Sequence, residues 1–118
     1  KPLWVMKALL KFHYWCYPKS FSLISLLDNA DDDRFSLFVK DDQAKLKRIV
    51  NFQFKQPQPA LVYYGSEVGV VQSESRMHFE YGDKSHGDAH ARALMPWQKL
   101  DKKLLADYQE LIKHRRRA

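Results

Sequence analysis

The sequence of 118 residues has the length of one domain, and its apolar fraction of 45% is sufficient for a hydrophobic core. The formal net charge of +6 makes nucleic acid a partner to consider, but the basic excess is concentrated at the two ends of the chain. A single cysteine excludes an internal disulfide, and neither an apolar run of about 18 residues nor a signal-peptide pattern is present, so no membrane span is expected.

The first predicted element is a helix within residues 1–19, which ends at Pro18. Its apolar stripe has helical spacing and comprises Val5, Ala8, Leu9, Phe12 and Cys16. Cys16 is therefore expected to lie in a core rather than to act as a nucleophile. Residues 21–27, FSLISLL, are short and partly alternating, which predicts a strand.

A second helix is predicted in residues 41–56, where Asp41 or Asp42 supplies the N-cap. Residues 60–65, ALVYYG, predict a strand buried on both faces, because its apolar residues do not alternate. Residues 66–100 are polar and without periodicity, which is typical of a long loop. Asp101 is expected to cap a final helix at 102–117. The core-facing stripe of that helix comprises Leu104, Leu105, Tyr108, Leu111 and Ile112.

The order strand, helix, strand predicts a parallel unit with a right-handed crossover. Two parallel strands leave both edges of a sheet open, so the chain is expected to be part of a larger α/β sheet or barrel rather than a finished domain. Ligands of such proteins bind at the carboxyl ends of the strands. Residues 28–33 and the segment from Gly65 onward both lie at those ends, which makes this edge the expected site.

The segment LLDNADDDRF contains four aspartates. Their residue type and spacing by themselves favour a hydrated loop at the end of a strand. Arg34 is expected to pair with a neighbouring carboxylate. No metal site is predicted, because the run lacks the Gly and Glu of a calcium loop. The acids and histidines of the long loop also lack a cysteine pair and a helical pattern; they are His78, Glu80, Asp83, His86, Asp88 and His90.

Several motifs occur together in one order along the chain. Asn29-Ala30-Asp31 follows the first strand, Tyr63-Tyr64-Gly65-Ser66-Glu67 ends the second, and Arg92, Met95 and Trp97 precede the last helix. Over residues 21–118 this order resembles the C-terminal part of an α-amylase-type catalytic barrel, glycoside hydrolase family 13. The family has Asn-His-Asp, Tyr-Tyr-Gly-x-Glu and Arg-x-x-Met-x-Trp at these places.

The resemblance implies that residues 1–118 form the C-terminal segment of a (β/α)8 barrel, an α/β fold of which only the last strands and helices are present. It implies a parent enzyme that cleaves or transfers α-glucosidic bonds in starch-like substrates or malto-oligosaccharides with retention. Asp31 matches the third catalytic carboxylate, and Asn29, Glu67 and Arg92 are the candidate substrate-binding residues.

The same resemblance places the nucleophile and the general acid on earlier strands, so this segment by itself is expected to be inactive. The implied partners are an α-glucan and the rest of the barrel, with neither nucleic acid nor a membrane. No cofactor is certain, and calcium is the one that the resemblance allows in the parent enzyme.

Ala30 departs from the family pattern, because a methyl group cannot replace the hydrogen bonds that the family's histidine makes to a bound sugar. A non-catalytic amylase-like module for binding or assembly is therefore an alternative. A small basic nucleic-acid-binding α/β protein is another, although the terminal KHRRR is also typical of cations that complement a helix dipole. Tyr63 and Tyr64 are expected to pack in the core or to stack on sugar rings.

Overall fold

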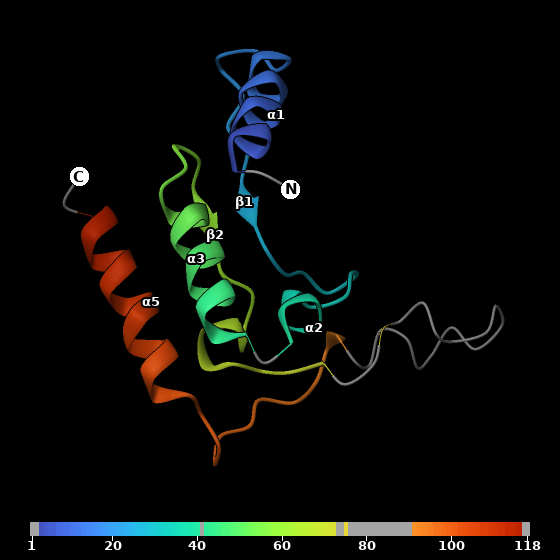
Figure 1. Cartoon of the computed structure of the whole chain (residues 1–118), viewed down its shortest axis with the longest axis vertical. Coiled ribbons are helices and arrows are strands. Elements are labelled where there is room, and N and C mark those ends of the chain that lie inside the picture. The colour runs from blue at the N-terminus through green and yellow to red at the C-terminus, as the bar shows by residue number, and fades with distance from the viewer. Residues whose placement is uncertain (1–2, 41, 73–74, 76–90, 117–118) are drawn as a thin grey trace, which may run out of the picture.

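The computed structural model describes residues 3–40, 42–72, 75 and 91–116 (Figure 1). Its elements follow one another in the order α1 (Leu3–Trp15), β1 (Ser25–Leu26), α2 (Phe35–Val39), α3 (Gln43–Phe54), β2 (Ala60–Leu61), the 3-10 helix η1 (Ser66–Val68) and α5 (Lys102–Arg115). The described part of the chain contains no helix that is long and apolar enough to cross a membrane.

The two strands pair in parallel, with Ser25 opposite Ala60 and Leu26 opposite Leu61, which confirms the predicted strand–helix–strand unit. Both strands are shorter than residues 21–27 and 60–65, from which they were predicted. The prediction that the second strand is buried on both faces is wrong, because Leu61 is exposed. Within the described residues the sheet consists of these two strands, so each has an uncovered edge.

The core lies between α3, α5 and the strands. Figure 1 shows α3 and α5 side by side, and Val50, Phe54, Leu104 and Tyr108 form a buried cluster where they meet. The rings of Phe54 and Tyr108 meet edge to face at 5.9 Å between centroids, a favourable aromatic geometry. Gln53 joins α3 to both strands, because its Nε2 donates to the main-chain oxygens of Ser25 and Leu61.

Both predicted helix caps are confirmed. The Asp42 side chain accepts from the N–H of Lys45, and the Asp101 side chain accepts from the N–H of Leu104. Each bond satisfies one main-chain donor in the first turn, where no helical carbonyl is available. Of the two candidates, Asp41 and Asp42, the structure selects Asp42 as the N-cap of α3, and Asp101 directly precedes α5.

The prediction that the stripe of the first helix lies in a core is wrong for this chain. Leu9 and Phe12 are 59% and 62% exposed, and Cys16 is also exposed and follows the last residue of α1. An apolar hollow of about 870 Å³ separates α1 from α3 and β1. The stripe predicts which face of α1 suits burial, but nothing in the described residues covers that face.

Two short elements were not predicted. Helix α2 spans five residues and starts directly after the buried Arg34, and η1 lies inside the segment expected to be a long loop. Gly65 and Gly69 flank η1 with φ of 83° and 76°, in the left-handed region that favours glycine. These turns bring the chain after β2 back toward the turn after β1.

Candidate functional site

Asn29 builds the turn that follows β1. Its Oδ1 accepts from the N–H groups of Asp31 and Asp32, each at 2.7 Å, and its Nδ2 donates to Oδ2 of Asp32 at 2.8 Å. Asparagine is well suited to this local hydrogen bonding. The amide predicted to bind substrate is therefore engaged on both of its polar atoms, and it acts here by shaping the turn that carries Asp31.

Asp31 and Arg92 lie together, as the predicted site requires, although 61 positions separate them in the sequence. Arg92 Nη2 is 3.2 Å from Asp31 Oδ1, and Arg92 Nε donates to the Ala30 carbonyl at 3.1 Å. The Asp31 side chain is 83% exposed and that of Arg92 48%. Exposed ion pairs contribute only about 0–1 kcal/mol, and the Asp31 carboxylate is accessible to solvent.

Arg34 is completely buried. Its Nε donates to the Ala91 carbonyl at 2.8 Å and its Nη1 to the Tyr64 carbonyl at 2.9 Å. Its guanidinium carbon lies 4.8 Å and 4.9 Å from the ring centroids of Tyr63 and Tyr64, within cation–π range. The prediction that Arg34 pairs with a carboxylate is wrong, because carbonyls and aromatic rings surround it in the described part of the chain.

The two tyrosines after β2 form part of the same cluster. Their rings meet at 4.7 Å, and the Tyr64 hydroxyl donates to the Ala93 carbonyl at 2.9 Å. Burial and the neighbouring Tyr64 raise the pKa of Tyr63 above its ordinary value. Tyr63 and Tyr64 thus face Arg34 and each other, and neither lies in the hydrophobic core between α3 and α5.

Asp28 and Asp33 are not the hydrated acids predicted from the run. Asp28 is 7% exposed and accepts from the Phe35 N–H and from the Ser66 hydroxyl, which joins the end of β1 to α2 and η1. Asp33 accepts from Gln72 Nε2 and from the Ser75 hydroxyl. Both carboxylates therefore connect the acidic turn to the chain after β2, while Asp31 faces solvent.

Glu67 lies in η1, in the segment that follows β2. Its Oε2 is buried and accepts no hydrogen bond within the described part of the chain. Burial is the main cause that raises the pKa of Tyr108 above its ordinary value, and the negative charges of Asp28 and Glu67 raise it further. The electrostatic effect on Tyr108 therefore places Glu67 near Asp28 and Tyr108.

The described residues contain no group of three or more His, Cys, Asp or Glu side chains that could hold a metal ion. The loop acids and histidines considered as ligands lie outside the described residues; they are His78, Glu80, Asp83, His86, Asp88 and His90. The absence of a metal site and the calcium of the parent enzyme both stay predictions.

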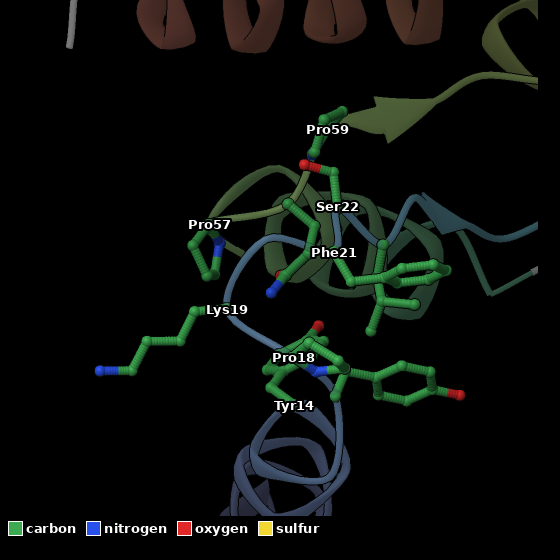
Figure 2. A pocket seen from close by; sticks show the side chains of 10 residues that line it. Tyr14, Pro18, Lys19, Phe21, Ser22, Pro57 and Pro59 are labelled. Carbon is green, nitrogen blue, oxygen red and sulfur yellow. The ribbon is translucent and has the colours of Figure 1, made fainter.

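A second hollow, of about 280 Å³, lies at the opposite, amino ends of the strands (Figure 2). Tyr14, Phe21 and Pro59 are among its lining residues, and the Lys19 side chain extends away from Phe21. Its polar lining consists of Tyr14, Tyr17, Lys19, Ser22 and Gln58, and none of its lining residues among the described part of the chain is a carboxylate. The acids of the turn after β1 lie instead at the carboxyl ends of the strands, which therefore form the candidate site.

The sequence predicted neither the burial of Arg34 against carbonyls nor the contact between Arg34 and Tyr64; for Tyr64, core packing and stacking on sugar rings were both left open. The signal for Arg34 was weak: a cation directly after a run of acids suggests an ion pair, not burial against carbonyls. For Tyr64 the signal was its place at the end of a strand, where α/β proteins position ligand-side groups.

A parallel β1–α3–β2 unit with an acidic turn at the carboxyl end of its first strand defines the chain as part of an α/β protein. No protein-family model matches it. Two curated proteins do: Alpha-amylase 2 of Dictyoglomus thermophilum is 34% identical over 102 residues, which cover 85% of this chain and 17% of that protein. A Cyclomaltodextrinase of Bacillus sp is 35% identical over 103 residues, or 84% of this chain and 16% of that protein.

The chain thus spans about one sixth of the length of the curated relatives it matches. The two matches confirm the resemblance seen in the sequence, that to a partial segment of alpha-amylase-family proteins. The parallel pairing of β1 and β2 shows the α/β class. A barrel is implied for the parent protein by the amylase-family relatives, and the two strands of the described residues do not by themselves show one.

Proposed function

We propose that this chain is part of a glycoside hydrolase that cleaves or transfers α-glucosidic bonds, and that Asp31 is the carboxylate it contributes to the reaction. The names of the two relatives, an alpha-amylase and a cyclomaltodextrinase, support the substrate class. The single observation that carries the residue assignment is the exposed Asp31 carboxylate, held at the carboxyl end of β1 by the Asn29 turn and contacted by Arg92.

The chemistry follows from charge. Cleavage of a glycosidic bond passes through an oxocarbenium-like transition state, in which positive charge develops on the sugar ring. A carboxylate whose position is set before the reaction stabilises that charge and accepts hydrogen bonds from sugar hydroxyls. Arg92 offers hydrogen-bond donors beside the same carboxylate. When a sugar binds, its hydroxyl groups would replace part of the exposed ion pair between Asp31 and Arg92.

Two further carboxylates, a nucleophile and a general acid, complete a retaining mechanism. In this proposal both belong to parts of the parent protein outside this chain, and the chain alone is inactive. The candidate roles of Asn29 and Glu67 differ: Asn29 shapes the turn, and Glu67 acts through the packing of η1 on α5 rather than by touching the sugar.

The test is Asp31→Asn in the full-length parent, with Asp32→Asn as the matched control in the same turn. Removing one transition-state contact lowers kcat by about 10²–10³-fold in comparable sites. We expect a loss of at least that size for Asp31→Asn, an unchanged melting temperature, and little change for Asp32→Asn. Equal kcat in wild type and Asp31→Asn would remove Asp31 from the mechanism.

A non-catalytic amylase-like binding module is the second candidate, and Ala30 is the observation that favours it. Such a module would bind malto-oligosaccharides, measured by calorimetry, without releasing reducing ends, whereas the hydrolase produces them. Binding without turnover in the full-length parent would select this candidate.

A further inference from the structure

The turn that carries Asp31 is shaped by the side chain of Asn29. The Asn29 amide oxygen accepts from the N–H groups of Asp31 and Asp32, each at 2.7 Å, which sets the local course of the main chain. These bonds lie inside the turn, so they do not attach it to the rest of the site. Asp28, the residue directly before Asn29, makes that attachment at the end that follows β1.

Asp28 is only 7% exposed, and both oxygens of its carboxylate are engaged in partly buried hydrogen bonds. Oδ1 accepts from the Phe35 N–H at the start of α2, and Oδ2 accepts from the Ser66 hydroxyl at the start of η1. Hydrogen bonds to a carboxylate are about twice as strong as those between neutral groups. Because Phe35 follows Asp28 by seven positions, the first bond closes the whole turn across its base.

Ser66 belongs to a turn that is itself tightly packed. Gly65, directly before it, has a φ of 83°, and a Cβ added there would lie 2.5 Å from Val70 Cγ2. The Val70 N–H donates to the Gly65 carbonyl at 2.9 Å, and Val70 is buried. The bond between Asp28 and Ser66 therefore attaches the turn after β1 to a closely packed turn after β2, and these are the two strand ends that form the candidate site.

The other end of the acidic turn is held separately. Arg34 is buried, and its N–H donates to Gln72 Oε1 at 2.6 Å. Asp31 belongs to the first end, because its N–H is bound by Asn29, the neighbour of Asp28. Loss of the Asp28 carboxylate would therefore release the half of the turn that carries Asp31, while the half next to α2 keeps its own bonds.

We propose that Asp28 is a positioning residue, whose carboxylate holds the turn through Phe35 and Ser66 so that the Asp31 carboxylate is presented in the orientation that the reaction needs. Asp28 acts through Asp31 and does not itself touch the sugar. This inference rests on the proposed function, in which Asp31 is the carboxylate that takes part in the reaction.

The test compares wild type, Asp28→Ala and Asp28→Asn as full-length parents. Their kcat and KM are measured on a malto-oligosaccharide at a temperature at which circular dichroism shows each variant folded. Asp28→Ala should lower kcat by about tenfold to 10²-fold, because a reacting group displaced by about 1 Å loses that much. Asp28→Asn should keep most of the activity, because its amide oxygen accepts from the Phe35 N–H and its amide nitrogen donates to the Ser66 hydroxyl. An unchanged kcat in Asp28→Ala, or equal losses in the two variants, would overturn the inference.

Phe54→Ala separates positioning from stability. Phe54 packs on Tyr108 in the core, at the end of α3 that leads to the amino end of β2, so its loss should lower the melting temperature at least as much and leave kcat unchanged. A loss of kcat as large as that of Asp28→Ala would mean that Asp28 is merely structural. Ser66→Ala removes one of the two bonds and replaces Asp28→Ala if that variant does not fold; it should lower kcat severalfold, and no loss would contradict the role of Asp28.

A double variant shows whether Asp28 acts through Asp31. In the Asp31→Asn background, Asp28→Ala should cause no further loss of kcat, because the charge that it positions is gone. The same loss in both backgrounds would overturn the inference, whereas Asp31→Asn by itself decides the proposed function.

Hydrogen exchange followed by mass spectrometry does not depend on turnover. Residues 29–33 should exchange severalfold faster in Asp28→Ala than in wild type and at the wild-type rate in Asp28→Asn, with α5 equal in all three proteins. An unchanged rate in residues 29–33 of Asp28→Ala would refute the positioning role, even in a parent that proves inactive on α-glucans.

Discussion

Replacing Asp28 should destabilise the chain more than replacing an exposed acid of the same turn. Asp28 is 7% exposed, and its two oxygens have different partners: Oδ1 accepts from the Phe35 N–H and Oδ2 from the Ser66 hydroxyl. The first bond attaches the end of β1 to the start of α2, and the second attaches it to η1. Removing the carboxylate therefore disconnects three elements.

The magnitude depends on what replaces the carboxylate. A hydrogen bond to a charged group contributes about 1.5–3 kcal/mol, and the Ser66 hydroxyl is only partly buried and recovers some of its loss from water, so Asp28→Ala should cost about 2–4 kcal/mol. Asp28→Asn should cost only about 1 kcal/mol, because the amide oxygen keeps the Phe35 N–H and the Ser66 hydroxyl can turn to accept from the amide nitrogen.

Urea unfolding followed by circular dichroism measures both free energies. Asp32→Ala is the control, because it removes the same charge from an exposed position of the same turn, where the carboxylate accepts from Asn29 Nδ2. The reasoning is refuted if Asp28→Ala destabilises the chain no more than Asp32→Ala does. It is also refuted if Asp28→Asn and Asp28→Ala lower the free energy of unfolding equally, because the larger loss expected for Asp28→Ala follows from losing both hydrogen bonds.

Three further predictions concern the core and its surroundings. Because burial raises the pKa of Tyr108, the unfolded chain loses the phenol proton above about pH 10 while the folded chain retains it. Above about pH 10 this group therefore lowers the free energy of unfolding by about 1.4 kcal/mol per pH unit. Tyr108→Phe should make that decline shallower in urea titrations at pH 9–11.5, and identical slopes would contradict the assignment. Gly65→Ala should destabilise by about 1–3 kcal/mol, because the added Cβ would lie 2.5 Å from Val70 Cγ2 at a φ of +83°; failure of Val70→Ala to recover any of that loss would argue against the steric cause. Leu104→Ala, at a side chain 2% exposed, should cost about 2–5 kcal/mol, against less than about 1 kcal/mol for Ile112→Ala at 43% exposed, and similar costs would mean that α5 packs differently.

The features predicted correctly from the sequence are those decided by neighbours in the chain. Asp42 and Asp101 cap helices because each carboxylate reaches an N–H three residues ahead, a relation that local sequence reveals. The strands were placed correctly but were too long, since a ladder extends only as far as a partner strand pairs with it. The stripe of α1 was predicted to be buried and is exposed, because periodicity identifies an apolar face without identifying what covers it.

The roles of the acids could not be predicted in the same way, because their partners are distant in sequence. Asp28 meets Ser66 across 38 positions, and Asp33 meets Gln72 across 39. Adjacent aspartates look equivalent in composition, and only the fold decides which of them faces solvent. Arg34 shows the same limit, since its acceptors are main-chain carbonyls that carry no signature of residue type.

Residue 30 contributes to the site through its main chain. The group at residue 30 that Arg92 contacts is the main-chain carbonyl, which every residue type supplies, so the turn and the approach of Arg92 to Asp31 do not require the family's histidine. In the proposed function the alanine would therefore lack the side-chain hydrogen bond that the family's histidine offers to a sugar, while the geometry that presents Asp31 is kept. Under that proposal the difference at residue 30 would bear on how tightly a sugar is held and how well its transition state is stabilised, rather than on whether the carboxylate is in place.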